Sequence, residues 1–213
     1  MIQPYDAAAA SMALSAADRR LGRLIARVRP CEIEFSCAST PFQTLLRAIV
    51  HQQLSGRAAE AIHRRVLSLA PRRRVLTPAR VAKLCDAELR AGGLSRAKVI
   101  AIQDLAARTL DGTVPSRRGL ERLSDDEIVE RLVVVRGIGR WTVEILLMFY
   151  CTRPDVLPVD DLGVRKGYMA TYRTSKLPTT NELGEYGERW GPYRSVASWY
   201  LWRAVDSAQP KPA

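Results

Sequence analysis

The segment Leu132–Tyr168, LVVVRGIGRWTVEILLMFYCTRPDVLPVDDLGVRKGY, decides the fold of this chain of 213 residues. It places Gly137-Ile138-Gly139 between two apolar patterns that have helical spacing. Asp160 and Asp161 follow roughly twenty residues later and open a third helical pattern. A glycine hairpin lets the backbone approach an anion, and the helix start behind it attracts negative charge. The segment therefore predicts a protein that grips a nucleic-acid backbone and acts at one sugar.

The composition limits the class of protein. Hydrophobic residues make up 47% of the chain and charged residues 26%, as in ordered globular proteins. The formal net charge of +11 points to a polyanionic partner: DNA, RNA or an anionic membrane. No apolar run approaches the ~20 residues of a membrane helix, and the N-terminus lacks the features of a signal peptide. We expect a cytoplasmic protein with no membrane partner.

Helical patterns run through almost the whole chain. Ser95 is placed to begin one helix, and Ser124 with Glu127 forms a capping box before another. Thr77-Pro78 is typical of a helix start, and Ser55 is a candidate N-cap. The one alternating stretch, residues 31–37, has no obvious partner strand. The sequence predicts an all-α fold with two helical lobes.

An aspartate at a helix start usually only caps that helix. Here the neighbouring motifs change the interpretation. RGIGRWT at the hairpin, DLGVR from Asp161, QQLS at 52–55 and the closing WGPYRS with WYLWR resemble the helix-hairpin-helix DNA glycosylases. Within them, the chain is similar to the DNA-3-methyladenine glycosylase II family. The similarity runs roughly from Pro41 to Arg203, and it implies the compact, all-helical type without an N-terminal β-domain.

The resemblance implies two lobes flanking a DNA-binding cleft, with a helix-hairpin-helix motif. We expect residues 1–40 to form an N-terminal helix and an extended segment that pack on the C-terminal lobe. Residues 41–130 would form the helical lobe that carries a wedge loop. Residues 131–213 would form the helix-hairpin-helix and catalytic lobe.

The family match assigns catalysis to Asp161, with Asp160 as its structural neighbour. A carboxylate close to C1′ would stabilise the positive charge that develops as the base leaves, and the helix start favours its ionised form. The hairpin would bind a DNA phosphate and, as in relatives, a monovalent cation (Na⁺ or K⁺). Arg136 departs from the proline of many relatives. The expected phosphate-binding residues are Arg136, Gly137, Ile138, Gly139, Arg140 and Thr142.

The flipped base needs an aromatic pocket, because a cationic alkylated purine is attracted to π-faces. The family match makes Trp141 and Trp202 the expected pocket walls, and we expect Trp190 and Trp199 to pack the lobe. Trp141 also stands where lyase relatives have a lysine, which implies base release by water alone. Further pocket candidates are Glu144, Tyr150 and His51.

The loop at 52–55 resembles the family loop that fills the gap left by a flipped base. Gln53 and Leu54 are both candidates for this wedge, and the sequence does not decide between them. The segment Gly93–Lys98 also resembles the family and is interpreted as structural or backbone-contacting. His63 is expected at the surface.

Cofactors are expected to be absent apart from the hairpin cation. The four cysteines, Cys31, Cys37, Cys85 and Cys151, form no CxxC pair and none follows Cys151. The pattern therefore predicts neither zinc nor the iron–sulfur cluster of the endonuclease III branch. The expected partner is double-stranded DNA with damaged bases, bound by a monomer.

The favoured function is a monofunctional DNA glycosylase that flips and excises alkylated purines, of the 3-methyladenine and 7-methylguanine type, in base excision repair. A second hypothesis keeps the fold but changes the lesion to a neutral base such as hypoxanthine, an etheno adduct or a mismatched adenine. Such a base needs protonation to leave, and Glu144 is the candidate acid, with a helix-surface salt bridge as its alternative role. The third hypothesis is a non-catalytic helix-hairpin-helix DNA-binding module.

Overall fold

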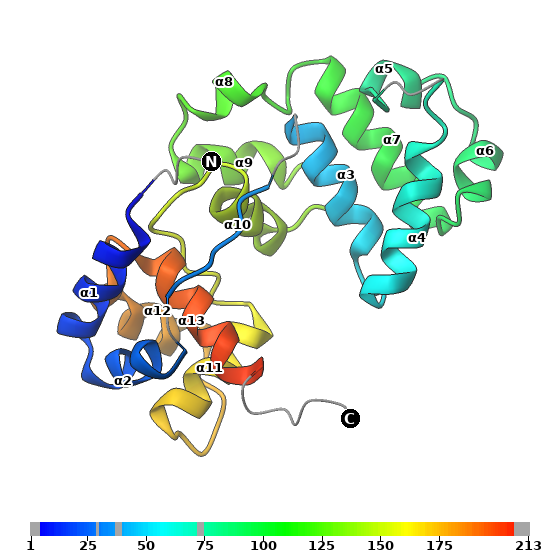
Figure 1. Cartoon of the computed structure of the whole chain (residues 1–213). Coiled ribbons are helices and arrows are strands. Elements are labelled where there is room, and N and C mark those ends of the chain that lie inside the picture. Colours follow the sequence, from blue (N-terminus) through cyan, green and yellow to red (C-terminus); the bar gives the residue numbers. More distant parts are fainter. Residues whose placement is uncertain (1–4, 29, 37–39, 72–74, 207–213) are drawn as a thin grey trace. The chain divides into compact units, whose positions relative to one another are not determined.

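The computed structural model describes residues 5–28, 30–36, 40–71 and 75–206, and every regular element in these ranges is a helix (Figure 1). The predicted all-α fold is confirmed. The stretch 31–36 is irregular, and Cys37 lies outside the described residues. Within the described ranges, no helix combines the length and the apolar character that crossing a bilayer would require.

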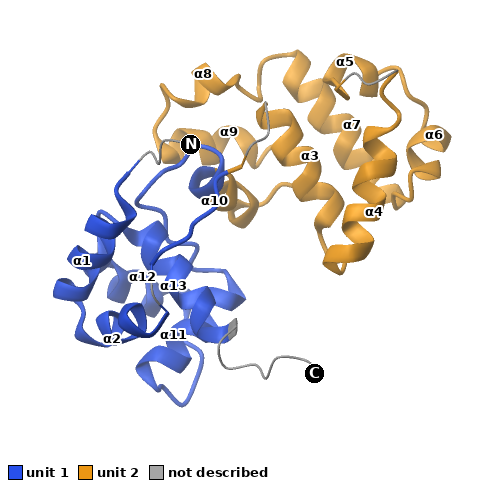
Figure 2. Cartoon of the chain, in the orientation of Figure 1, with its two compact units in different colours: residues 1–35, 147–213 blue, residues 36–146 orange. Residues whose placement is uncertain are grey.

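The chain divides into two compact units, coloured separately in Figure 2. Unit 1 comprises residues 1–35 and 147–213, and unit 2 comprises residues 36–146. These divisions differ from the expected boundaries at 41 and 131, because the hairpin and the helix before it belong to unit 2. Contacts of the hairpin with α7 and with the end of α3, given below, account for this placement.

Unit 1 is built around α11 and α13, which pack on each other and on α2, while α1 covers α2. Its core includes Trp190 and Trp199, so the expectation that these two tryptophans pack the lobe is confirmed. Buried Asp18 accepts hydrogen bonds from Tyr172 Oη at 2.5 Å and Trp190 Nε1 at 3.1 Å. The helices are α1 (Ala7–Ala17), α2 (Arg19–Val28), α11 (Leu162–Tyr172), α12 (Thr180–Gly187), the 3₁₀ helix η1 (Glu188–Trp190) and α13 (Arg194–Asp206).

Unit 2 is organised around α7, against which α3, α5 and α6 pack, and α4 lies against α3. Buried leucine, isoleucine and valine side chains of these helices form its interior. Its helices are α3 (Pro41–His51), α4 (Gly56–Leu67), α5 (Pro78–Val81), α6 (Asp86–Ala91), α7 (Arg96–Leu110), α8 (Arg117–Leu120) and α9 (Asp125–Leu132). The next helix, α10 (Arg140–Phe149), begins in unit 2 and ends in unit 1.

Local capping rules place most helix starts correctly. The side chains of Thr77 and Ser95 accept hydrogen bonds from the backbone N–H three residues on, and Ser124 with Glu127 forms the predicted capping box. Ser55 occupies the N-cap of α4, but its side chain makes no capping hydrogen bond. The start of α4 therefore leaves the Ser55 hydroxyl available in the exposed loop before it.

Candidate active site and nucleic-acid interface

Asp161 is the N-cap residue of α11 in unit 1. Its Oδ1 accepts one hydrogen bond from the Val164 N–H at 2.7 Å and another from Trp202 Nε1 at 2.8 Å. Two donors on one oxygen, at the start of a helix, fix the direction of the carboxylate. Asp160, next to it, is exposed at the turn before the helix. The carboxylate that the fold holds in place is thus that of Asp161.

Gly163 makes the contact between Asp161 and Trp202 possible. A Cβ at this position would lie 3.0 Å from Asp161 Oδ1 and 2.8 Å from Trp202 Cδ1. Any larger residue would push the indole away from the carboxylate. The role of Gly163 is not visible in a short stretch of sequence, because its partner Trp202 lies on another helix far along the chain.

Trp202 has a second environment besides the carboxylate. Its ring stacks on Phe149, with centroids 5.9 Å apart and an interplanar angle of 24°. Both residues line a pocket of about 720 Å³ in unit 1, together with Glu32, Glu34 and Arg203. The indole is half-buried, with its N–H bonded to Asp161, and it lines a pocket that combines aromatic, acidic and basic residues.

The hairpin in unit 2 turns through Gly137, whose φ is +76°, a value that glycine adopts readily. Gly139 does not have a positive φ. Space around Gly139 is open, and α10 begins directly after it. The first N–H groups of a helix have no acceptor within that helix, which makes them donors for an anion.

Two hydrogen bonds within unit 2 anchor this hairpin. The Arg136 N–H donates to Asp104 Oδ2 of α7 at 2.8 Å, and Gln52 Nε2 donates to the Gly137 carbonyl at 2.8 Å. Ile138 is buried, and so is Thr142, whereas Arg136 and Arg140 are exposed. The backbone is thus fixed while two cationic side chains face solvent.

The first turn of α10 carries two further candidates. Trp141 is 43% exposed, which leaves much of its ring accessible. Glu144 is only 5% exposed, and its Oε1 accepts from Arg140 Nε at 3.1 Å. The alternative of a salt bridge for Glu144 is therefore confirmed, although the carboxylate is buried and not at the helix surface.

The loop between α3 and α4 exposes the two wedge candidates. Gln53 has a φ of +56°, in the left-handed region, and Leu54 is 40% exposed. Lys98 braces this loop from α7, since its Nζ donates to the carbonyls of Val50 at 2.7 Å and Gln52 at 2.8 Å. Burial lowers the pKa of Lys98. These contacts give Lys98 a structural role, one of the two roles expected for the segment Gly93–Lys98.

Tyr150 and His51 differ from the other pocket candidates. Tyr150 is 2% exposed, so its ring is enclosed by protein. His51 is the last residue of α3 and lies with its Nε2 3.6 Å from Glu60 Oε2. His63, expected at the surface, is buried, because α4 turns this side chain toward α3.

An all-helical chain with a glycine hairpin at a helix start and a carboxylate N-cap held by a tryptophan defines the class of helix-hairpin-helix DNA glycosylases. The model of the HhH-GPD superfamily base excision DNA repair protein matches residues 46–192. The chain belongs to this superfamily.

Relatives agree with this assignment. The chain is 38% identical over 190 residues to DNA-3-methyladenine glycosylase 1 of Schizosaccharomyces pombe, covering 89% of this chain and 82% of that protein. A solved structure of the S. pombe 3-methyladenine DNA glycosylase in complex with abasic DNA matches with a TM-score of 0.83 at 37% identity, over 95% of this chain and 99% of that one. A crystal structure of the DNA-3-methyladenine glycosidase of Bacillus halodurans matches with a TM-score of 0.83 at 32% identity. The match covers 92% of this chain and 88% of that one.

Proposed function

We propose that this protein is a monofunctional DNA glycosylase that excises alkylated purines, such as 3-methyladenine and 7-methylguanine, in base excision repair. The observation that carries the proposal is the Asp161 carboxylate, fixed at the start of α11 by Trp202. Membership of the superfamily and the activity named for the S. pombe relative support it.

The proposed reaction requires mainly that the protein place a negative charge close to the sugar. An N3- or N7-alkylated purine is cationic and leaves with the electron pair of the C1′–N bond, becoming neutral. Positive charge then develops on the sugar, and the Asp161 carboxylate stabilises it. Water adds to C1′ and loses a proton, which leaves an intact abasic strand.

We assign recognition of the flipped base to the aromatic faces of Trp141 and Trp202. A cationic purine gains attraction from an indole face that a neutral purine lacks. The pocket beside Trp202 is lined by Glu32 and Glu34 as well as Arg203, so acidic residues outnumber basic ones there, which suits a cation. We keep Tyr150 and His51 as weaker candidates, since Tyr150 is enclosed and His51 faces Glu60.

Absence of lyase activity follows from Trp141. An indole cannot form the Schiff base through which a lysine at this position cleaves the strand. Borohydride should therefore trap no covalent protein–DNA adduct, and strand breaks should appear only after heat or alkali. Efficient trapping would contradict the monofunctional assignment.

The DNA backbone would be held by the hairpin residues Arg136–Arg140 and Thr142, and the gap in the stack would be filled by Gln53 or Leu54. The hairpin carbonyls of Val135 and Gly137 each accept one hydrogen bond and have a second lone pair, so they fit as ligands for a monovalent cation. Such an ion would add positive charge for the phosphate. We propose that the protein acts as a monomer in the cytoplasm, at the nucleoid if the source is bacterial.

Release of a neutral lesion is the second candidate function, with Glu144 as the acid. The ion pair between buried Glu144 and Arg140 supports a structural role for this carboxylate instead. The deciding experiment scores free base from DNA methylated at purine nitrogens and from DNA containing hypoxanthine. Release of methylated purines at a rate well above that of hypoxanthine supports the proposal; release of hypoxanthine alone, or of no base, would overturn it.

A further inference from the structure

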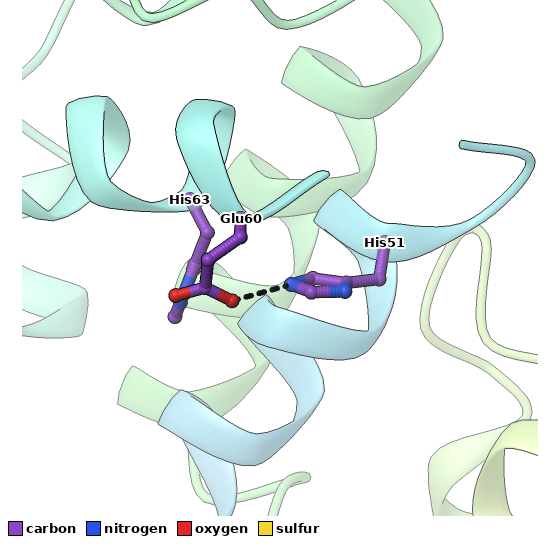
Figure 3. A group of neighbouring side chains, drawn as sticks. All are labelled: His51, Glu60 and His63. Carbon is purple, nitrogen blue, oxygen red and sulfur yellow. Dashed lines mark ion pairs between the residues drawn. The ribbon is translucent and has the colours of Figure 1, made fainter. Parts of the chain in front are cut away.

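Three potential metal ligands meet where α3 and α4 pack together (Figure 3). His51 is the last residue of α3, whereas Glu60 and His63 lie three residues apart on α4 and so share one face of that helix. One ligand atom from each of the three residues lies within 4.8 Å of the others. The group belongs to unit 2, is formed by that unit alone, and has no part in the proposed chemistry at Asp161.

The donor set is that of a transition-metal site. Two imidazole nitrogens and one carboxylate oxygen are the ligands that Zn²⁺ and its neighbours bind in proteins, and three protein ligands leave one position for water. Glu60 Oε2 lies 3.6 Å from His51 Nε2, and the two imidazole rings have centroids 5.8 Å apart. His63 is buried and His51 half-buried, so protein surrounds much of the group.

A cationic group already lies among these atoms. Arg47 NH1 is 2.9 Å from Glu60 Oε2 and 3.3 Å from His63 Nδ1. A guanidinium only donates hydrogen bonds, so in this contact His63 Nδ1 is the acceptor and directs its lone pair at the cation. The Arg47 side chain is 52% exposed and can turn into solvent without leaving a cavity.

We propose that His51, Glu60 and His63 bind one divalent transition-metal ion of the Zn²⁺ type, which takes the place of the Arg47 guanidinium. The ion joins the last turn of α3 to α4, and these helices flank the loop that carries Gln53 and Leu54. The prediction that the chain uses no zinc was drawn from the cysteine pattern alone, and this site contains no cysteine.

The test is a Zn²⁺ titration of the metal-free full-length protein by calorimetry. The background variant Cys85→Ser removes an exposed thiol and keeps a favoured N-cap residue. One ion should bind per chain, and Co²⁺ should give d–d bands without a thiolate charge-transfer band. His51→Ala and Glu60→Gln should each weaken binding at least about tenfold, whereas Glu130→Gln, an exposed glutamate of the same unit, should leave it unchanged.

Arg47→Gln is the more specific test of the proposal, because it removes the competing cation and none of the ligands. Zn²⁺ affinity should rise about tenfold in this variant, as expected for loss of one unit charge next to the ion. Binding that is equal in wild type, His51→Ala and Glu60→Gln would place the ion elsewhere and overturn the proposal. Absence of binding in both wild type and Arg47→Gln would overturn it as well. Circular dichroism of each variant checks that the fold is intact.

Discussion

The hairpin and loop of unit 2 are held differently from the carboxylate of unit 1. In unit 2, Gln52 and Lys98 donate to main-chain carbonyls, and Asp104 accepts from a main-chain N–H, so the backbone is fixed and side chains such as Arg136 and Leu54 face solvent. In unit 1, the contacts converge on the side chain of Asp161 itself. A surface that grips a polymer needs a fixed backbone with accessible donors, whereas a group that stabilises one charge must itself be fixed.

The comparison predicts that substitutions at these contacts in unit 1 reduce the rate of base release, whereas substitutions at the contacts in unit 2 reduce DNA binding. Asp161→Asn should show the largest effect, a loss of about 10²–10³ in the single-turnover rate of base release, because one preorganised charge is removed. Binding to abasic DNA should stay within about twofold of wild type, since one isosteric side chain changes. Single-turnover kinetics and fluorescence anisotropy measure the two quantities. If Asp160→Asn is inactive while Asp161→Asn is not, the assignment of the carboxylate is wrong.

Trp202→Phe should have the next largest effect. It keeps an aromatic face for the base and removes the indole N–H that donates to Asp161 Oδ1. A hydrogen bond to a charged group contributes about 1.5–3 kcal/mol, so we expect a rate loss of about 10- to 100-fold. Trp199→Phe is the same change on the same helix, at a residue that lines the same pocket but is not the donor to Asp161, so it controls for the loss of indole surface there. A wild-type rate in Trp202→Phe with a strong loss in Trp202→Ala would mean that the ring only stacks on the base.

Gly163→Ala tests the contact between Trp202 and Asp161 by steric displacement of the indole. The added Cβ would displace the indole by several tenths of an ångström, since it would lie 2.8 Å from Trp202 Cδ1. We expect a rate loss of about tenfold, with most of the folding free energy retained, because a displaced hydrogen bond is weakened and not abolished. Gly184→Ala, a helical glycine whose added Cβ has its nearest neighbour at 3.9 Å, is the matched control. Equal rates in both variants would show that the Trp202 contact does not matter for catalysis.

Features set by neighbouring residues could be predicted from the sequence, and features set by distant ones could not. Ser95 and Ser124 cap helices through bonds to residues three positions on, so their roles are visible in a short window. The bond from Trp202 to Asp161 spans 41 residues, and the burial of His63 depends on its packing against another helix. Residue types and spacings identified the hairpin and the carboxylate, but they gave neither the partner of that carboxylate nor the φ of Gly139.

Lys98→Ala tests how the loop that carries the wedge candidates is held in unit 2. The Lys98 ammonium holds the carbonyls of Val50 and Gln52, so its loss should loosen the loop that carries Gln53 and Leu54. We expect affinity for abasic DNA to fall about five- to tenfold and the free energy of unfolding to fall by about 1–3 kcal/mol. The rate of base release at saturating enzyme should change by a smaller factor than the affinity for abasic DNA. Lys83→Ala, an exposed lysine of the same unit and the same loss of charge, controls for electrostatics. A rate loss without a loss of affinity would contradict the division of roles.

Arg136→Ala should give the smallest effect and the most direct evidence for a phosphate contact at the hairpin. The backbone of Arg136 is held by Asp104, so the substitution removes an exposed guanidinium without moving the turn. If a small protein neutralises about 4 phosphates, the slope of log K against log salt is about −3.6, and loss of one contact makes it less negative by about 0.9. Arg118→Ala, an exposed arginine in α8, matches the change in net charge. Affinities for undamaged duplex at four salt concentrations give both slopes. A slope that changes equally in the two variants would assign the effect to net charge, whereas a change confined to Arg136→Ala would place a phosphate beside this residue.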